Sequence, residues 1–344
     1  MKELQRFFRT TFQWKQFFCI LPNMRIGIDL GGTKIEGIVM NHEGDVLERI
    51  RKPTPKGDYE GIISRIAAIV RELETRVDGR HTIGVGTPGA VSPATGLLKN
   101  SNSTALNGRP LREDLQKTLG RPIEFTNDAN CFALSEALGG SGDGKEVVFG
   151  VIIGTGTGAG VVVRGKVLSG PNAIAGEWGH NPLPWPRPDE LPGPVCYCGR
   201  RGCLETYLSG PGMASDHLRI SGEGQEEKNG TTKKPEPGDI LRMAQQGDER
   251  SEDTLRRYED RLARGLAHVI NILDPDVIVL GGGLSNIDRL YKNVPKLWGE
   301  YVFSDTVETL LLPPRFGDSG GVRGAALLPS LEKKGGTRKN HLEG

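Results

Sequence analysis

Two stretches of the chain repeat one order of strands and tight turns. Residues 24–50 read as a strand, the turn GGT, a second strand, the turn NHEGD and a third strand. Residues 147–168 repeat this order, with GTGTG as the first turn and RGK as the second. Short runs rich in β-branched residues and separated by glycine-containing turns are typical of antiparallel hairpins. The repeated pattern therefore predicts two related halves, each built around a three-stranded meander.

The segments that follow predict helices and buried strands. Apolar residues at helical spacing indicate an amphipathic helix around residues 61–74, and TIGVGT then reads as a strand. Late in the chain, a helix around residues 260–273 precedes DPDVIVLGGGL, whose continuous apolar run is typical of a buried strand. A chain of 344 residues is long enough for two lobes with separate cores. We expect an α/β protein whose two halves face each other across a cleft.

The overall charge gives no reason to expect a nucleic acid or a membrane as partner. The chain has 44 basic and 43 acidic residues, so no net field attracts a polyanion. It has no run of about 18 apolar residues, the length that a membrane-spanning helix needs. Residues 1–23 lack the continuous apolar stretch of a signal peptide. We expect a cytoplasmic protein with small-molecule partners, a dispensable extension at residues 1–23 and a polar tail at residues 331–344.

A proline-rich segment carries one histidine and three of the five cysteines. His180, Cys196, Cys198 and Cys203 offer one nitrogen and three sulfur ligands, a set that binds structural zinc tetrahedrally with no open position. The alternative is a group of buried free cysteines beside an unrelated histidine, and a disulfide is disfavoured because cysteines one residue apart pair poorly. The spacing therefore predicts a structural Zn²⁺ site.

The first turn of each meander has the composition of a loop that binds phosphate. Glycines in DLGGTK and GTGTG expose backbone N–H groups, and threonine hydroxyls add donors for the oxygens of a polyphosphate. Asp29 ends the strand before the first loop, where it is placed to hold Mg²⁺ directly or through water. Either loop alone is equally compatible with a plain hairpin turn, and Lys34 with a side chain in solvent. The residues expected at the phosphates are Gly31, Gly32, Thr33, Lys34, Gly154, Thr155, Gly156 and Thr157, with Gly282 and Gly283 of a third glycine cluster beside an adenosine ring.

Five motifs follow one another in the order of a known family. They are DLGGTK, TNDANC, GTGTGAG, GEWGH with CYCGRRGCLE, and DPDVIVLGGGLS. In this order they resemble the ROK family of sugar kinases and repressors over residues 24–330. The resemblance implies the actin-like, ribonuclease H-like ATPase fold of hexokinases, with ATP and sugar in the cleft between two lobes, and a homodimer. It also implies an N-terminal lobe of residues 24–126 with 316–330, and a C-terminal lobe of residues 127–315 that carries the zinc motif.

Within the family, three segments are most similar to bacterial fructokinase or manno(fructo)kinase. They are KNSNSTALNG, AGEWGHNPLPW and GDSGGVRGAA. The resemblance implies ATP-dependent phosphorylation of fructose to fructose 6-phosphate, with mannose as a second substrate. N-acylhexosamine kinases share NDANCFALSEA and a related glycine-rich ending, so an N-acylhexosamine kinase or a glucokinase is the alternative.

The resemblance also assigns roles to polar residues of the cleft. Asp128, at the start of an apolar helix, resembles the general base that accepts the proton of the attacking sugar hydroxyl. Without the family, capping of that helix is an equally good interpretation of Asp128. Asn127 is expected at a neighbouring hydroxyl of the sugar. Glu177 and Glu205 are expected to accept sugar hydroxyls, with solvated surface charges as the alternative. The zinc ligand His180 is also expected near the sugar, so the metal orders the pocket without taking part in the chemistry.

A ROK repressor is the non-enzymatic alternative. Such repressors carry a helix-turn-helix domain of some tens of residues before the kinase-like part. The 23 residues ahead of Met24 are too few for that domain, and intact DLGGTK and Asp128 favour catalysis. The balanced charge argues against a zinc-ribbon module that binds nucleic acid.

Overall fold

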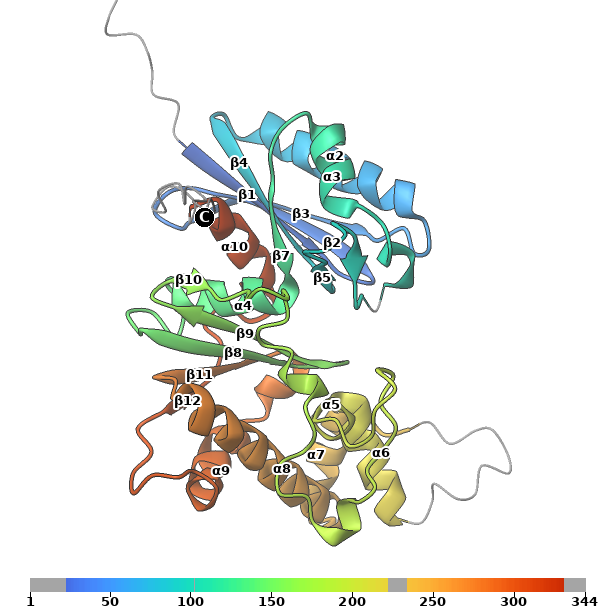
Figure 1. Ribbon diagram of the computed structural model, residues 1–344, viewed down its shortest axis with the longest axis vertical. Coiled ribbons are helices and arrows are strands. Elements are labelled where there is room, and N and C mark those ends of the chain that lie inside the picture. Colours follow the sequence, from blue (N-terminus) through green and yellow to red (C-terminus); the bar gives the residue numbers. More distant parts are fainter. Residues whose placement is uncertain (1–22, 102, 222–233, 331–344) are drawn as a thin grey trace, which may run out of the picture.

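The structure, a computed structural model, describes residues 23–101, 103–221 and 234–330. The extension expected at residues 1–23 lies outside these ranges apart from Asn23, and the tail expected at residues 331–344 lies wholly outside them. Figure 1 shows two lobes stacked along the long axis of the molecule, each with its own sheet.

The first lobe is a five-stranded sheet covered by two helices. Its main elements are β1 (Asn23–Leu30), β2 (Lys34–Met40), β3 (Val46–Pro53), α2 (Tyr59–Arg76), β4 (Arg80–Thr87), α3 (Leu111–Leu119) and β7 (Glu124–Asn127), with the small hairpin β5 (Ala90–Val91) and β6 (Leu98–Lys99). The order β3-β2-β1-β4-β7 combines the predicted antiparallel meander with two parallel strands. Helix α2 begins after Asp58, whose carboxylate accepts the backbone N–H of Gly61 at 2.9 Å, and it buries a row of isoleucines.

The second lobe repeats this arrangement. Its elements are β8 (Val147–Ile153), β9 (Thr157–Val163), β10 (Lys166–Val167), α5 (Glu205–Leu208), α6 (Gly210–Ser221), α7 (Pro237–Gln245), α8 (Glu249–Leu273), β11 (Val277–Gly281), α9 (Arg289–Leu297) and β12 (Leu310–Leu312). The sheet order β10-β9-β8-β11-β12 matches that of the first lobe strand for strand, so the prediction of two similar α/β halves is confirmed. The helix expected from residue 260 begins earlier, because Asp248 caps its end by accepting the N–H of Ser251 at 2.7 Å.

Two helices, α4 (Asp128–Ala137) and α10 (Gly320–Leu327), lie between the sheets (Figure 1). Helix α10 packs on the first sheet, α4 packs on the second, and the two helices pack on each other. Glycines permit this closeness: a Cβ at Gly324 would lie 1.7 Å from the backbone oxygen of Cys131, and one at Gly84 would lie 1.9 Å from that of Ala325. Helix α10 therefore approaches α4 and the first sheet through backbone contacts that only glycine allows.

The proline-rich segment between His180 and Cys196 is held against α8 by buried ion pairs. Glu190 accepts hydrogen bonds from Arg261 at 2.8 Å and from Arg264 at 2.7 Å, and each arginine side chain is only 1% exposed. Burial alone would raise the pKa of Glu190, but the hydrogen bonds from Arg264 and Arg261 lower it to about 2. This network fixes the loop that presents the cysteines.

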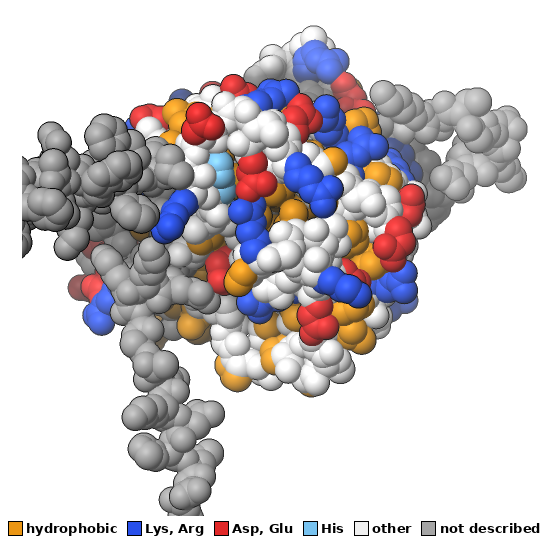
Figure 2. Space-filling model, turned by 90° about the horizontal axis from the view of Figure 1, so that it is seen from above, with side chains coloured by type: hydrophobic (Ala, Val, Ile, Leu, Met, Phe, Trp, Pro, Cys, Tyr) orange, Lys and Arg blue, Asp and Glu red, His pale blue; other side chains and the backbone are white. Residues whose placement is uncertain are grey.

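Within the ranges that the structure describes, no helix combines the length and the apolar character needed to cross a bilayer. On the face shown in Figure 2, basic and acidic side chains are interspersed rather than gathered by sign.

Candidate functional site

The turn from β7 into α4 places two predicted residues side by side. The carbonyl oxygen of the Asn127 side chain accepts the backbone N–H of Asn130 at 2.8 Å, so Asn127 is the residue that caps α4. The carboxylate of Asp128 accepts the N–H of Ala129 at 2.8 Å. Asp128 is accessible to solvent, yet desolvation by the surrounding protein raises its pKa to about 6, opposed by hydrogen bonds from backbone N–H groups and helped by the charge of Glu177. The capping role considered for Asp128 thus belongs to its neighbour, and Asp128 has the pKa of a weak base near neutrality.

Asp29 lies at the end of β1, near Asp128. Burial raises the pKa of Asp29 to about 7, the charges of Asp128 and Glu36 add to this, and Lys34 opposes it. Glu36 is itself buried and paired with arginines of β3. Gly321 of α10 leaves Asp29 its space, since a Cβ there would lie 3.2 Å from the carboxylate. A cation bound at Asp29 would relieve this concentration of negative charge, so the residue fits the expected Mg²⁺ site.

The loop after β1 is a tight, exposed hairpin. The N–H of Gly31 is bonded to the backbone oxygen of Lys34 at 3.0 Å, so this donor serves the turn. Gly32 has open space where a side chain would be, and Thr33 and Lys34 are exposed. Gly32, Thr33 and Lys34 are therefore the members of this loop that a ligand can reach.

The GTGTG loop is engaged by neighbours on several sides. The backbone oxygen of Gly154 accepts the N–H of Gly210 at 2.8 Å, and the N–H of Gly154 is bonded to the oxygen of Gly156 at 2.9 Å. The N–H of Thr157 donates to the carboxylate of Glu205 at 2.9 Å. Glu205 is a predicted sugar contact, and no local pattern indicates this bond to the GTGTG loop, which lies 48 residues away in the chain. Thr157 therefore offers its backbone N–H to Glu205 rather than freely to a phosphate.

The three residues of the third glycine cluster, Gly281 to Gly283, have different surroundings. Gly281 packs against the ring of Phe132, and Gly282 adopts a φ of 80° where a Cβ would lie 2.5 Å from the backbone oxygen of Ile153. Gly283 is open, and its backbone nitrogen lies 4.0 Å from the position of a Cβ on Gly154. Two of the three glycine motifs that the sequence separates thus lie against each other at the same edge of the second sheet.

The four predicted metal ligands come together. Their ligand atoms all lie within 4.8 Å of one another. The Nδ1 atom of His180 is 3.6 Å from the sulfur of Cys196, and the sulfurs of Cys198 and Cys203 are 3.6 Å apart. Bonds of about 2.3 Å to sulfur and about 2.0 Å to nitrogen at a tetrahedral angle place such atoms about 3.6 to 3.8 Å apart. The donor set and its spacing therefore fit zinc.

Tyr197 is a residue of this region that sequence reasoning missed. Its hydroxyl lies 3.0 Å from Nε2 of His180, the ring nitrogen that does not face the cysteine sulfurs, and the two rings pack edge to face at 5.2 Å. The side chain remains 74% exposed. The available signal was that Tyr197 lies between Cys196 and Cys198 in the chain. Two predicted metal ligands on either side would fix its backbone.

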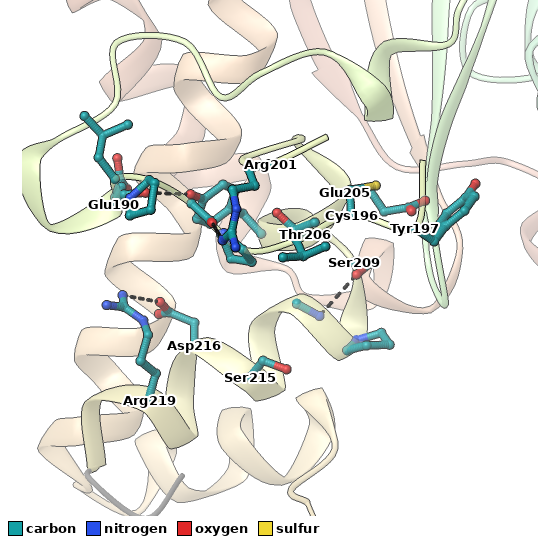
Figure 3. A pocket seen from close by; sticks show the side chains of 18 of the residues that line it. Glu190, Cys196, Tyr197, Arg201, Glu205, Thr206, Ser209, Ser215, Asp216 and Arg219 are labelled. Atoms are coloured by element: carbon teal, nitrogen blue, oxygen red, sulfur yellow. Dashed lines mark hydrogen bonds and ion pairs between the residues drawn. The ribbon is translucent and has the colours of Figure 1, made fainter. Parts of the chain in front are cut away.

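A cavity of about 630 Å³ adjoins these residues (Figure 3). Tyr197 and Glu205 lie beside Cys196 at one end of it, and Asp216 and Arg219 of α6 lie at the other end. Thr155 also lines the cavity. The predicted residues thus form two groups, with Asp29 and Asp128 at the junction of the lobes, and Glu205 and His180 on the second lobe.

The whole chain resembles known proteins with this architecture. A family model described as ROK family matches residues 25–331. The N-acetyl-D-glucosamine kinase of Vibrio atlanticus (strain LGP32) is 38% identical over 309 residues, which cover 89% of this chain and 99% of that enzyme. The crystal structure of a ROK hexokinase from Thermus thermophilus is similar with a TM-score of 0.78 at 31% identity, covering 90% of this chain and 99% of that one. A ROK glucokinase from Streptomyces griseus in complex with glucose and AMPPNP has a TM-score of 0.71 at 28% identity, covering 89% and 99%. By these matches, and by motifs that take their expected places on the fold, the chain belongs to the ROK family.

Proposed function

We propose that the protein transfers the γ-phosphoryl group of ATP to a hydroxyl of N-acetyl-D-glucosamine. Membership of the family and the kinase relatives make it an ATP-dependent sugar kinase. One observation supports the choice of sugar. The N-acetyl-D-glucosamine kinases of Vibrio atlanticus and Pasteurella multocida are each 38% identical to this chain and match it along 99% of their own length.

Fructose, the substrate expected from KNSNSTALNG and AGEWGHNPLPW, is less well supported than the N-acylhexosamine alternative. Those segments are short, whereas the similarity to N-acetyl-D-glucosamine kinases extends over 89% of the chain. Sugars that differ by one group are separated by pocket shape and by the hydrogen bonds that each can make. Fructose and mannose therefore become competing outcomes of the test.

In the proposed reaction, Asp128 acts as the general base. Its ionised carboxylate accepts the proton of the sugar hydroxyl while the hydroxyl oxygen forms a bond to the γ-phosphorus, and the bond from that phosphorus to the leaving oxygen of ADP breaks. A pKa of about 6 leaves Asp128 mostly ionised at neutral pH yet basic enough to hold the proton. Asn127 keeps the helix end in place and orients Asp128 from the adjacent position.

The phosphates are held from both lobes. Asp29 supplies the carboxylate for Mg²⁺, which would neutralise charge on the transferring group. Gly32, Thr33 and Lys34 approach from the first lobe, while Thr155 and Gly156 approach from the second. Because phosphoryl transfer depends mainly on positioning, residues that bring these two loops to one polyphosphate contribute to the rate.

A zinc ion is proposed at His180, Cys196, Cys198 and Cys203, whose spacing supports it. When bound, zinc would order the segment that carries His180 and Glu205 and would leave the chemistry to other groups. Purified protein should then contain about one zinc per chain, and Cys198→Ser should lower both the zinc content and the melting temperature. Full activity in protein that lacks zinc would contradict this ordering role.

A coupled assay of ADP release tests the choice of sugar. The panel is N-acetyl-D-glucosamine, N-acetylmannosamine, glucose, mannose and fructose, each with saturating ATP and Mg²⁺. We expect kcat/KM for N-acetyl-D-glucosamine to exceed that for any other sugar by at least about tenfold, a typical effect of a few pocket contacts. A preference for fructose or mannose would restore the first expectation, and the absence of ADP release with every sugar would contradict the kinase assignment.

A further inference from the structure

Thr157 lies in the GTGTG loop and is the first residue of β9. It is contacted on two sides by residues 176–205, the segment that carries the four predicted metal ligands and that we call the metal-binding module. The backbone N–H of Thr157 donates to the carboxylate of Glu205 at 2.9 Å. On the other side, a Cβ at Gly179 would lie 1.9 Å from the backbone oxygen of Thr157, so the GEWGH segment lies directly against it. Thr157 is 6% exposed. Thr157, which precedes the final glycine of GTGTG, is thus contacted by two parts of the same module.

The GEWGH segment follows β9 further along the strand. The N–H of Ala159 donates to the backbone oxygen of Gly176 at 3.1 Å. A Cβ at Gly176 would lie 2.2 Å from the oxygen of Ala159, so only glycine fits this approach. Trp178, buried between these contacts, donates its indole N–H to the backbone oxygen of Gly265 on α8. The segment that leads to His180 is therefore a rigid flank of the loop strand.

Glu205 reaches the loop from the opposite end of the metal-binding module. It follows Cys203 by two residues, and the intervening Leu204 is fully buried and donates its N–H to the oxygen of Asn181 at 2.8 Å. Cys203 and Pro182 also pair through their backbones in an isolated antiparallel β-bridge. Two backbone links therefore join the residues after His180 to those before Glu205. Figure 3 shows Glu205 beside Cys196 and Tyr197 at one end of the cavity.

Gly156 shows that the carboxylate is fitted closely to the loop. A Cβ at Gly156 would lie 2.8 Å from the Glu205 oxygen that accepts the Thr157 N–H. A carboxylate is an unfavourable neighbour for a polyphosphate, because like charges repel. A hydrogen bond that orders a glycine-rich loop before the nucleotide binds has the opposite effect, because less conformational entropy is then lost on binding. The contact therefore favours nucleotide binding through its geometry rather than its charge.

We propose that Glu205 is a positioning residue for the nucleotide, through which the His180 and cysteine module sets the conformation of the GTGTG loop. This proposal rests on the proposed function, which supplies the nucleotide as ligand. It extends the role of Glu205 beyond the sugar: the residue couples the metal-binding module to the affinity for ATP and ADP, and it does so with no sugar present.

The test measures the affinity for MgADP by calorimetry, without sugar, in the full-length protein. Glu205→Ala removes the acceptor for Thr157, and we expect about tenfold weaker binding, the usual effect of losing a hydrogen bond to a charged group. Glu205→Gln keeps an acceptor and removes the charge, so its affinity should stay within about threefold of the wild-type value or improve. Asp189→Ala is the matched control: Asp189 is exposed and lines the same cavity, so the substitution removes a nearby carboxylate and leaves the hydrogen bond between Thr157 and Glu205 in place, and the MgADP affinity should be unchanged.

A second arm tests the coupling to the module. The protein is depleted of metal by a chelator, the chelator is removed, and MgADP binding is measured again. Depletion should weaken binding in the wild type but add little in Glu205→Ala, because both changes break the same link. If metal depletion weakens MgADP binding by the same factor in Glu205→Ala as in the wild type, the module does not act on the nucleotide through Glu205.

The outcomes separate this proposal from the proposed function. If the wild type binds no MgADP, the kinase assignment fails. If it binds, and Glu205→Ala binds equally well, the positioning role fails while the kinase assignment stands. If Glu205→Ala does not fold by circular dichroism, Glu205→Asp decides, since its shorter side chain moves the carboxylate away from Thr157 and should weaken binding as the alanine does. Equal losses in Glu205→Gln and Glu205→Ala would overturn the geometric argument.

Discussion

At the scale of the residue, Asn127 and Asp128 follow each other at the end of β7, yet they have different environments. Asn127 uses its side-chain oxygen to cap α4. Asp128 lies near Asp29 and Glu177, and desolvation by the surrounding protein raises its pKa to about 6 although solvent still reaches the residue. A carboxylate whose proton affinity is raised in this way suits proton transfer near neutral pH, whereas a capping residue needs only an oxygen in the right place.

Asp128→Asn tests the assignment of the base. The amide keeps the size of the side chain but cannot accept the proton, so kcat should fall by about 10²- to 10⁴-fold while the affinity for sugar changes little. Steady-state ADP release gives kcat, and calorimetry gives the sugar affinity. Asn127→Ala is a suitable comparison, because it should lower the melting temperature more than Asp128→Asn does. Near-normal turnover in Asp128→Asn would remove Asp128 from the mechanism.

The pH dependence follows from the same raised pKa. A base acts when ionised, so kcat/KM should increase as the pH rises through about 6 and then level off. Mg²⁺ at saturation keeps the facing carboxylate of Asp29 ionised, which leaves the titration of Asp128 visible. The profile is measured with the preferred sugar in buffers of constant ionic strength. A rate that stays flat across this range, or that falls as the pH rises, would be incompatible with an ionised Asp128 as the base.

At the scale of the element, the loop before Cys196 depends on buried charge rather than on apolar packing. Glu190 is 6% exposed and bonds Arg261 and Arg264 of α8, while its carboxylate also accepts the backbone N–H of Arg187 at 2.8 Å. Arg261 and Arg264 have further acidic partners in Asp216 and Asp260. A loop rich in proline makes few hydrogen bonds of its own, so these ion pairs determine where it lies.

Glu190→Ala should destabilise the protein by about 3 kcal/mol. The substitution leaves two buried arginines without their shared partner, and breaking a buried ion pair from one side has this magnitude. Urea unfolding followed by circular dichroism measures the change. The control is Glu146→Ala, which breaks an exposed ion pair with Arg164 and should leave stability unaltered. A loss no larger than that of the control would show that the network does not hold the loop.

Acid should weaken this element as the pH falls below about 4.5. The pKa of Glu190 is lowered from 4.5 to about 2, so the stability that its charge provides is complete above pH 4.5 and is lost as the pH falls towards 2. We expect the free energy of unfolding to decrease with falling pH in this window. Glu190→Gln should show a shallower decrease, because it has no proton to bind. Parallel curves for the two proteins would assign the acid sensitivity to other carboxylates.

At the scale of the whole molecule, the candidate phosphate contacts are divided between the lobes. The loop after β1 belongs to the first sheet and is exposed, while the GTGTG loop follows β8 of the second sheet. One polyphosphate that contacts both loops would connect the two lobes, and we expect the lobes to close on it. Helices α4 and α10 form the junction, where close glycine contacts and a shared apolar cluster connect the lobes.

Ligands should therefore make the molecule more compact. With sugar and the non-hydrolysable nucleotide AMPPNP together, small-angle X-ray scattering should give a smaller radius of gyration than for the free protein. Asp128→Asn should compact equally, because closure requires binding but not chemistry. The same radius of gyration with and without both ligands would argue for a site already closed in the free protein. The lobe boundaries and the homodimer stay predictions.

The sequence by itself determined the elements and the chemistry of short windows. Glycine turns between β-branched runs predicted both meanders, and His180 and Cys203 could be predicted as metal ligands because metal binding requires particular side chains at particular spacings. The motif order also indicated the family. It could not separate fructose from N-acetyl-D-glucosamine, because that choice depends on the shape of a pocket assembled from distant segments.

Only the tertiary structure decided which of these residues touch. In the structure, Asn127 caps α4, the carboxylate of Glu205 accepts the backbone N–H of Thr157, and the hydroxyl of Tyr197 lies beside Nε2 of His180. Glu205 and Thr157 are 48 residues apart in the chain. Local patterns such as helical periodicity operate within a few residues, whereas contacts over this separation arise only when the packed core fixes where each segment lies.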